Sequence, residues 1–155
     1  MKLDYVQALK RVHEARGAWI THGQEPLLEQ NLLDAFRKSW QQQEVERQRY
    51  DIGNVNDWKN VFNALNSLSL FSQQLAIEVH GNIKPDANGL KQLKNYIQHN
   101  EHNLLLIVLP KQDSSSLKTA FFQTVEANGV VVALTATYPQ DRQRILGIAA
   151  EKLGM

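Results

Sequence analysis

Hydrophobic positions along the chain switch repeatedly between two spacings. Apolar residues three and four positions apart predict amphipathic helices, whereas short apolar or alternating runs predict strands. Helices are predicted at about Tyr5–Ala15, Pro26–Trp40, Trp58–Leu68, Leu90–Ile97, Leu117–Val125 and Gln140–Leu153. Strands are predicted at Ala18–Thr21, Val45–Ile52, Leu75–Val79, Leu104–Leu109 and Val130–Leu134.

The segment Leu104–Leu109 gives the strongest indication of the fold class. It is a continuous apolar run bounded by Asn103 and Pro110. Such a run is typical of a strand that is covered on both faces, as in a parallel sheet with helices on each side. Since strands and helices alternate along nearly the whole chain, we predict a wound α/β sheet of five strands with right-handed crossovers.

Glycine, proline and serine suggest where the helices begin and end. Gly17 is expected to stop the first helix, and Pro26 suits the first turn of the second, where a missing N–H costs nothing. Ser114–Ser116 is expected to cap the helix that follows it. The buried side of the second helix is expected to contain Leu28, Leu32, Phe36 and Trp40, with Leu27 and Leu33 beside them.

The connection after the third helix carries an apolar pair. At about 100° per residue, Leu70 and Phe71 fall well outside the apolar stripe of that helix, and serines and glutamines surround them. Such a pair either packs into the protein's own core or fills an apolar pocket on a partner. The pattern alone leaves both interpretations open. The stripe itself consists of Trp58, Val61, Phe62, Leu65 and Leu68.

The composition is ordinary for a soluble globular domain. The 155 residues are 43% hydrophobic and 21% charged, which fits one domain with a real core. The formal net charge of +1 argues against a strongly electrostatic binder of nucleic acid, although a local basic patch is compatible with it. The sequence has no cysteine, no apolar signal region and no membrane-length apolar run, so we expect a cytoplasmic protein.

The usual chemistry of nucleotide hydrolysis is missing. In such a sheet, the loop after the first strand holds a phosphate through glycine N–H groups and a lysine. Here the loop Thr21–Pro26 has one glycine and no lysine, and Glu25 places a carboxylate where positive charge is needed. No Gly-x-x-x-x-Gly-Lys-Ser/Thr motif occurs, and the third strand offers Glu78 without an adjacent Asp-Glu pair to hold magnesium. We therefore predict a protein that is not a nucleotide hydrolase.

Other candidate groups are more simply interpreted as structural. His99 and His102 lie three apart near a helix end with Glu101 between them, which is compatible with a metal site, but solvated polar residues are the simpler interpretation. No Gly-x-Ser-x-Gly elbow is present, and Ser114–Ser116 fits a cap better than a nucleophile. We expect no catalytic residue, no metal and no cofactor.

Four segments of the chain follow one another in a distinctive order. They are the turn His22–Leu28, Asp57-Trp58 at a helix start, Leu68-Ser69-Leu70-Phe71, and Leu104–Val108 before Lys111. Together they resemble the N-terminal region of the delta subunit of bacterial DNA polymerase III, the clamp-loader subunit that opens the sliding clamp. No single motif is exclusive, but their order and spacing together are fairly specific, and the resemblance extends over nearly all 155 residues.

This resemblance implies a fold and a site. The fold would be an AAA+-like, three-layer αβα domain of the P-loop NTPase type, with a mostly parallel five-stranded sheet. The position of the nucleotide loop, now degenerate, would fall on His22, Gly23, Gln24 and Glu25. The family's clamp-binding motif falls on Leu68, Ser69, Leu70 and Phe71, so that Leu70 and Phe71 would enter a hydrophobic pocket of the clamp.

The resemblance also implies partners and a domain division. Residues 1–138 would form the clamp-binding domain, and residues 139–155 the first helix of a lid domain in a piece of a longer protein. The partners would be the sliding clamp (beta subunit), other clamp-loader subunits contacted through domains beyond this chain, and primed DNA through the assembled complex. The subunit would not be an enzyme by itself. One departure is Ser72-Gln73-Gln74, where more basic or apolar residues are expected.

Two other functions stay open at this point. One is a generic α/β interaction domain that binds DNA through basic residues. The other is a nucleotide-dependent enzyme with an irregular site. Nucleotide binding would distinguish the second from the rest, and salt dependence would distinguish DNA binding from an apolar plug. The basic residues in question are Lys10, Arg11, Arg16, Arg37 and Lys38.

Overall fold

A computed structural model of the chain describes residues 1–68, 74–99 and 102–135. Its centre is a sheet of six strands in the order β1-β6-β2-β5-β4-β3, and every neighbouring pair is parallel. The predicted wound α/β sheet is therefore confirmed, but the expected count of five strands is wrong. The strands are β1 Lys2–Asp4, β2 Gly17–Gly23, β3 Glu46–Ile52, β4 Leu75–Gly81, β5 Leu104–Leu109 and β6 Val130–Leu134.

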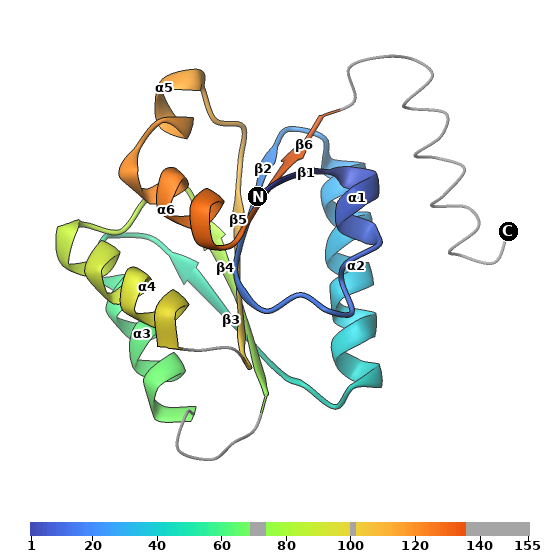
Figure 1. Ribbon diagram of the computed structural model, residues 1–155, viewed down its shortest axis with the longest axis horizontal. Helices are drawn as coiled ribbons and strands as arrows, with labels where there is room; N and C mark the ends of the chain where they lie inside the picture. The colour runs from blue at the N-terminus through green and yellow to red at the C-terminus, as the bar shows by residue number, and fades with distance from the viewer. Residues whose placement is uncertain (69–73, 100–101, 136–155) are drawn as a thin grey trace, which may run out of the picture.

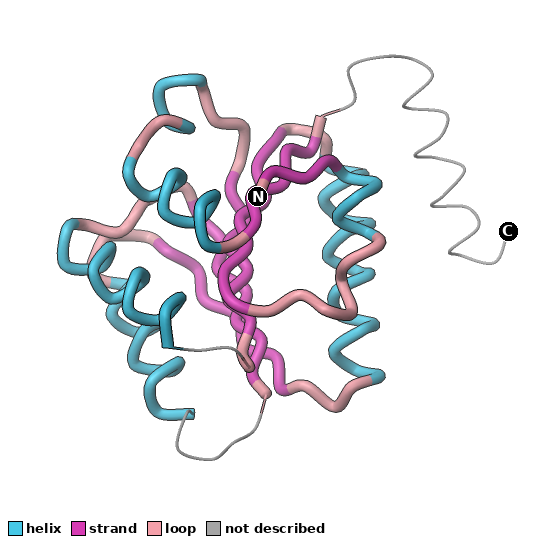
Figure 2. The backbone as a smooth tube through the Cα atoms, in the orientation of Figure 1, coloured by secondary structure: helices cyan, strands magenta, loops and turns pink. Residues whose placement is uncertain are grey.

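Helices cover both faces of the sheet, which makes three layers (Figure 1). On one face lie α1 (Tyr5–Leu9) and α2 (Pro26–Gln42). On the other face lie α3 (Asp57–Leu68), α4 (Ala87–His99) and α6 (Ala120–Asn128), with the short α5 (Ser114–Leu117) beyond them. Figure 2 shows the strands running between these two groups of helices.

β5, one of the two central strands, supplies core residues on both faces of the sheet. All six of its residues are buried. Leu104, Leu106 and Val108 pack toward α1 and α2, and the alternate residues pack toward α3, α4 and α6. The continuous apolar run was the signature of this double coverage, because neither face of the strand meets water.

In helix α2, all but one of the residues predicted to be buried are buried. Among them, Phe36 packs edge-on against Trp19 of β2 with ring centroids 5.4 Å apart. Leu27, which was expected beside them, is instead 53% exposed. The reason is helical geometry, since Leu27 lies on the same stripe as the exposed residues Asp34 and Lys38.

Several element boundaries differ from the prediction. Helix α1 ends at Leu9, and the chain continues in turns as far as Glu14. Gly17 does not stop a helix; it begins β2, with φ at +80°. The single helix expected after residue 113 is divided into α5 and α6, and the cap is Asp113, whose carboxylate accepts from the backbone N–H of Ser116 at 2.7 Å.

The predicted helix Gln140–Leu153, and with it the proposed boundary between residues 1–138 and 139–155, lies outside the described residues. Among the helices that the structure describes, none combines the length and the apolar character needed to cross a bilayer.

Candidate functional site

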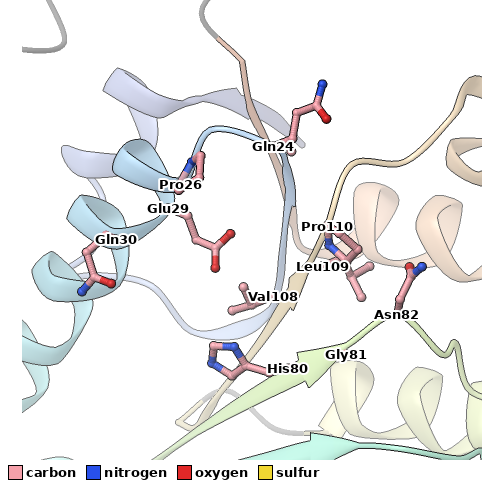
Figure 3. A pocket seen from close by; sticks show the side chains of 11 residues that line it. Gln24, Pro26, Glu29, Gln30, His80, Gly81, Asn82, Val108, Leu109 and Pro110 are labelled. Atoms are coloured by element: carbon pink, nitrogen blue, oxygen red, sulfur yellow. The ribbon is translucent and has the colours of Figure 1, made fainter.

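Parallel strands place their carboxyl ends at one edge of the sheet, where such folds bind their ligands. At this edge the ends of β2, β4 and β5 and the first turn of α2 enclose a crevice of about 640 Å³ (Figure 3). We call it the crevice hereafter. Gly23 and Gln24, which sequence reasoning assigned to the degenerate nucleotide loop, line it.

The turn between β2 and α2 cannot wrap a phosphate. β2 ends at Gly23 and α2 begins at Pro26, so only Gln24 and Glu25 separate the two elements. A phosphate cradle needs several free backbone N–H groups in a longer loop, and proline supplies none. The turn thus connects the two elements with little backbone left to bind an anion.

Gly23 serves packing at this turn. Its φ is +150°, and a Cβ at this position would lie 2.4 Å from the carbonyl oxygen of Leu134 at the end of β6. Only glycine combines this backbone conformation with such a close approach. The one glycine in the turn is therefore explained by the contact between strands β2 and β6.

His22 points away from the crevice. It is 8% exposed and packs edge-on against Phe122 of α6, on the other face of the sheet, with ring centroids 5.8 Å apart. Burial lowers the pKa of this imidazole. Alternation along β2 explains the direction, because Thr21 and His22 must face opposite sides.

The residue that sequence reasoning missed in the crevice is Glu29. It lies in the first turn of α2, and Figure 3 shows its carboxylate projecting from the helix toward Val108. The sequence contained one indication of this position. Glu29 follows Pro26 by about one helical turn, so both residues lie on the same side of α2. A carboxylate here disfavours a bound phosphate further.

Glu78 is the second feature of this region. It is 0% exposed at the middle of β4 and faces α2. Its carboxylate accepts from Arg37 Nη2 at 2.7 Å and from Arg47 Nε at 2.6 Å, and His80 Nε2 lies 2.9 Å from it. Both carboxylate oxygens are thereby occupied by side chains, which leaves little capacity for magnesium.

The ionisation of Glu78 follows from these contacts. Burial alone would raise the pKa of its carboxyl group, but hydrogen bonds from His80, Arg37 and Arg47 outweigh burial and lower the pKa well below its ordinary value of 4.5. Glu78 is therefore a charged partner for two arginines that come from different elements, α2 and β3.

Of the predicted clamp-binding residues, the structure describes only Leu68. Leu68 is the last residue of α3, and Ser69, Leu70 and Phe71 lie outside the described residues. The chain re-enters at Gln74, whose carbonyl accepts from Glu46 N at 3.2 Å. Asn103, which is buried, then accepts from Leu75 N at 2.9 Å through its side chain, so the start of β4 is fixed on both sides.

Two of the basic residues considered for DNA binding, Arg16 and Arg37, have partners within the described residues. Arg37 is bonded to Glu78. Arg16 donates to the carbonyl of Ala15 and to Gln43. Lys10 and Lys38 are exposed, but they come from the α1–β2 connection and α2 respectively.

The histidine and serine candidates make local contacts where the structure describes them, and Glu101, between His99 and His102, lies outside the described residues. No group of three or more histidine, aspartate or glutamate side chains could hold a metal ion within the described part of the chain. His99 Nδ1 lies 2.9 Å from the carbonyl oxygen of Asn95. Ser115 donates to Asp113 as part of the helix cap.

These observations predict that nucleotides do not bind. With ADP or with ATP and magnesium, we expect no saturable heat of binding up to about 1 mM, because the turn offers few N–H donors and Glu29 repels phosphate. Isothermal calorimetry measures this directly. Micromolar binding of either nucleotide would contradict the geometry and favour an enzyme with an irregular site.

Comparisons with known proteins agree with this fold. A sequence model of the family described as "DNA polymerase III, delta subunit" matches residues 19–135. A search of curated protein sequences found no match. Among solved structures, the DNA clamp loader delta protein of Bacillus subtilis is similar, with a TM-score of 0.68 and 10% identity, over 96% of this chain and 47% of that one.

Two further solved structures are similar across most of the chain. A Rhizobiales Trip13 protein matches with a TM-score of 0.56 and 9% identity, over 92% of this chain and 59% of that one. The ORC2 protein of Aeropyrum pernix matches with a TM-score of 0.53 and 12% identity, over 95% of this chain and 50% of that one. Both are AAA+ proteins, so the expected AAA+-like fold is confirmed. The chain spans about half the length of the Bacillus subtilis protein that it matches.

Proposed function

The chain belongs to the DNA polymerase III delta-subunit family of clamp-loader proteins in DNA replication, and from that we propose that it binds the sliding clamp through Leu68, Ser69, Leu70 and Phe71. The observation that carries the proposal is the family match, which spans residues 19–135 and so includes this motif. The subunit would be non-catalytic, in keeping with a crevice that lacks a phosphate cradle.

The described residues around the motif support this assignment. The stripe of α3 is buried through Leu65, and β4 begins at Leu75. Large apolar side chains that are clearly exposed in the described part of the chain are Met1, Leu27 and Val55. They come from three separate segments and do not supply an adjacent anchor pair of the kind that fills a partner's pocket.

Clamp opening follows if the bound segment prefers one form of the ring. A subunit can open a ring only by the difference between its affinities for the open and the closed form. Leu70 and Phe71 would supply the apolar anchor, and Leu68 would support it. Assembly with other loader subunits, and contact with primed DNA through the complex, would involve the rest of the protein, including a lid domain that begins near residue 139.

Calorimetric titration of the chain with the sliding clamp of the same organism tests the proposal. We expect saturable binding that a Leu70→Ala/Phe71→Ala double variant weakens by more than about tenfold, since anchor residues carry most of the energy of such contacts. Raising the salt concentration should change the affinity little, because the contact is apolar and phosphates are not involved.

A matched control separates the motif from general apolar surface. Leu27→Ala/Val55→Ala removes two exposed apolar side chains elsewhere and should leave the affinity unchanged. Circular dichroism establishes that each variant is folded. Equal binding by the wild type and the Leu70→Ala/Phe71→Ala variant would move the interface elsewhere, and absence of binding by the wild type would contradict the proposal.

A further inference from the structure

The proposed clamp contact involves Leu68–Phe71, none of which lines the crevice, and so leaves the crevice unused. We propose that the crevice binds an arginine side chain presented by a protein partner. Its chemistry is the reverse of that of a nucleotide site, and its walls, acceptors and charge together suit a guanidinium group.

The charge of the crevice comes from one acidic side chain. Eleven residues line it, and none of them is lysine or arginine. Glu29 is the one carboxylate among them, and it has no hydrogen-bond or ion-pair partner within the described residues. The nearby imidazole of His80 is committed to Glu78 through Nε2, at 2.9 Å. A cation entering the crevice therefore meets an unpaired negative charge.

One amide oxygen among the lining residues adds a second acceptor. Gln30 donates its Nε2 to Asp34 at 2.8 Å, which leaves its carbonyl oxygen as the group available to a ligand. Asn82 Oδ1 already accepts from Gln112 Nε2 at 3.0 Å. A planar guanidinium with five donors serves more than one acceptor better than the compact ammonium of lysine does.

The positive end of the α2 dipole does not cancel the preference of the crevice for a cation. A helix N-terminus carries a partial positive charge that attracts anions, but Pro26 occupies the first position and lacks an N–H. The N–H of Glu29 is bonded to the carbonyl of Glu25 at 3.0 Å. The full charge of Glu29 exceeds the partial charge of the helix end.

The remaining walls fit the apolar part of an arginine side chain. Val108, Leu109 and Pro110 form one wall and Pro26 another (Figure 3). Arginine buries its methylene groups along such surfaces while its head group stays polar. The volume of about 640 Å³ admits the side chain together with part of the peptide that carries it.

Nuclear magnetic resonance titration with small probes tests this inference. The ¹⁵N-labelled chain is titrated with N-acetyl-arginine amide and with N-acetyl-citrulline amide, which has the same shape without the charge. We expect saturable shifts at the backbone amides of Gln24, Glu29 and Asn82 with the arginine probe. The citrulline probe should bind at least about fivefold more weakly, as expected for loss of one exposed charge pair.

Two variants locate the binding. Glu29→Gln should weaken the arginine probe by about fivefold, and Glu14→Gln, an exposed carboxylate before β2 at the far end of the sheet, should not. Equal shifts from both probes, indifference to Glu29→Gln, or the same shifts from ADP would overturn the inference. Equal binding of N-acetyl-lysine amide would overturn the choice of a guanidinium.

The result of the arginine-probe titration does not depend on the result of the clamp-binding experiment. Because the residues that line the crevice do not include any of Leu68–Phe71, Glu29→Gln should leave clamp affinity unchanged. Loss of clamp binding in the Leu70→Ala/Phe71→Ala variant should likewise leave the arginine probe bound. Failure of one experiment thus says nothing against the other.

Discussion

Replacing Glu78 with alanine should lower the free energy of unfolding by about 3 kcal/mol, the lower end of the cost of removing one partner from a buried ion pair. Glu78 is fully buried, and its carboxylate joins Arg37, Arg47 and His80. Without it, two guanidinium groups face each other across an empty space. Their side chains are 31% and 38% exposed, so water reaches both, and the cost stays near the lower end.

Chemical denaturation followed by circular dichroism measures the change in the free energy of unfolding caused by Glu78→Ala. Asp51→Ala is the matched control, because Asp51 also pairs with an arginine, Arg49, at 3.1 Å, but is 71% exposed. An exposed pair of this kind contributes between about 0 and 1 kcal/mol. Equal effects of the two substitutions would show that the buried carboxylate is not the centre of the network.

The effect of Glu78→Ala should depend on pH with a definite sign. The pKa of Glu78 is lower in the folded protein than its ordinary value of 4.5, so the carboxylate stabilises the fold at pH values above about 4.5. Below that value the unfolded chain takes up the proton first, and the stabilisation is lost as the pH falls toward the folded pKa. The difference between wild type and variant should therefore shrink as the pH falls below about 4.5. A difference that grows on acidification would contradict the assignment.

Gly23→Ala should also be strongly destabilising, by more than about 3 kcal/mol, because two costs add at this position. The backbone has φ at +150°, which side chains rarely permit. In addition, the new Cβ would lie 2.4 Å from the carbonyl oxygen of Leu134. That oxygen belongs to the backbone of β6 and cannot rotate away as a flexible side chain would.

Other glycines allow the two costs to be separated. Gly17 has φ at +80° but no atom within 4 Å of an added Cβ, so Gly17→Ala should cost only about 1 kcal/mol, the cost of the backbone conformation. Thermal and denaturant unfolding of both variants measure the difference. If Gly23→Ala costs no more than Gly17→Ala, the contact between β2 and β6 is looser than described, and the turn has room for another role.

The sequence predicted those elements whose burial leaves a local trace. β5 is apolar throughout because helices cover both of its faces, and α2 shows a three- and four-residue spacing because one side of it is buried. β1 was missed because only Leu3 of its three residues is buried. What makes it a strand is its pairing with β6, which no local pattern records.

The candidate sites were predictable only in part, for a similar reason. The absence of a phosphate cradle could be read directly, since it depends on the residues between β2 and α2. The ion network around Glu78 could not, because Arg37 and Arg47 reach it from α2 and β3. The alternation along β4 indicated only that Glu78 faces away from Ile77, and whether that face is covered depends on a helix placed elsewhere in the chain.

The strand order has a consequence for synthesis of the protein. β1 is synthesised well before its partner β6, and β2, one of the two central strands, lies between β5 and β6. Pairings between such distant segments slow folding, since a long loop must close before any contact forms. During translation, β1 and β2 therefore each keep an unpaired edge until β6, which ends at Leu134, has been synthesised. A nascent chain stopped before β6 would expose those edges, which are the kind of surface that chaperones protect from aggregation.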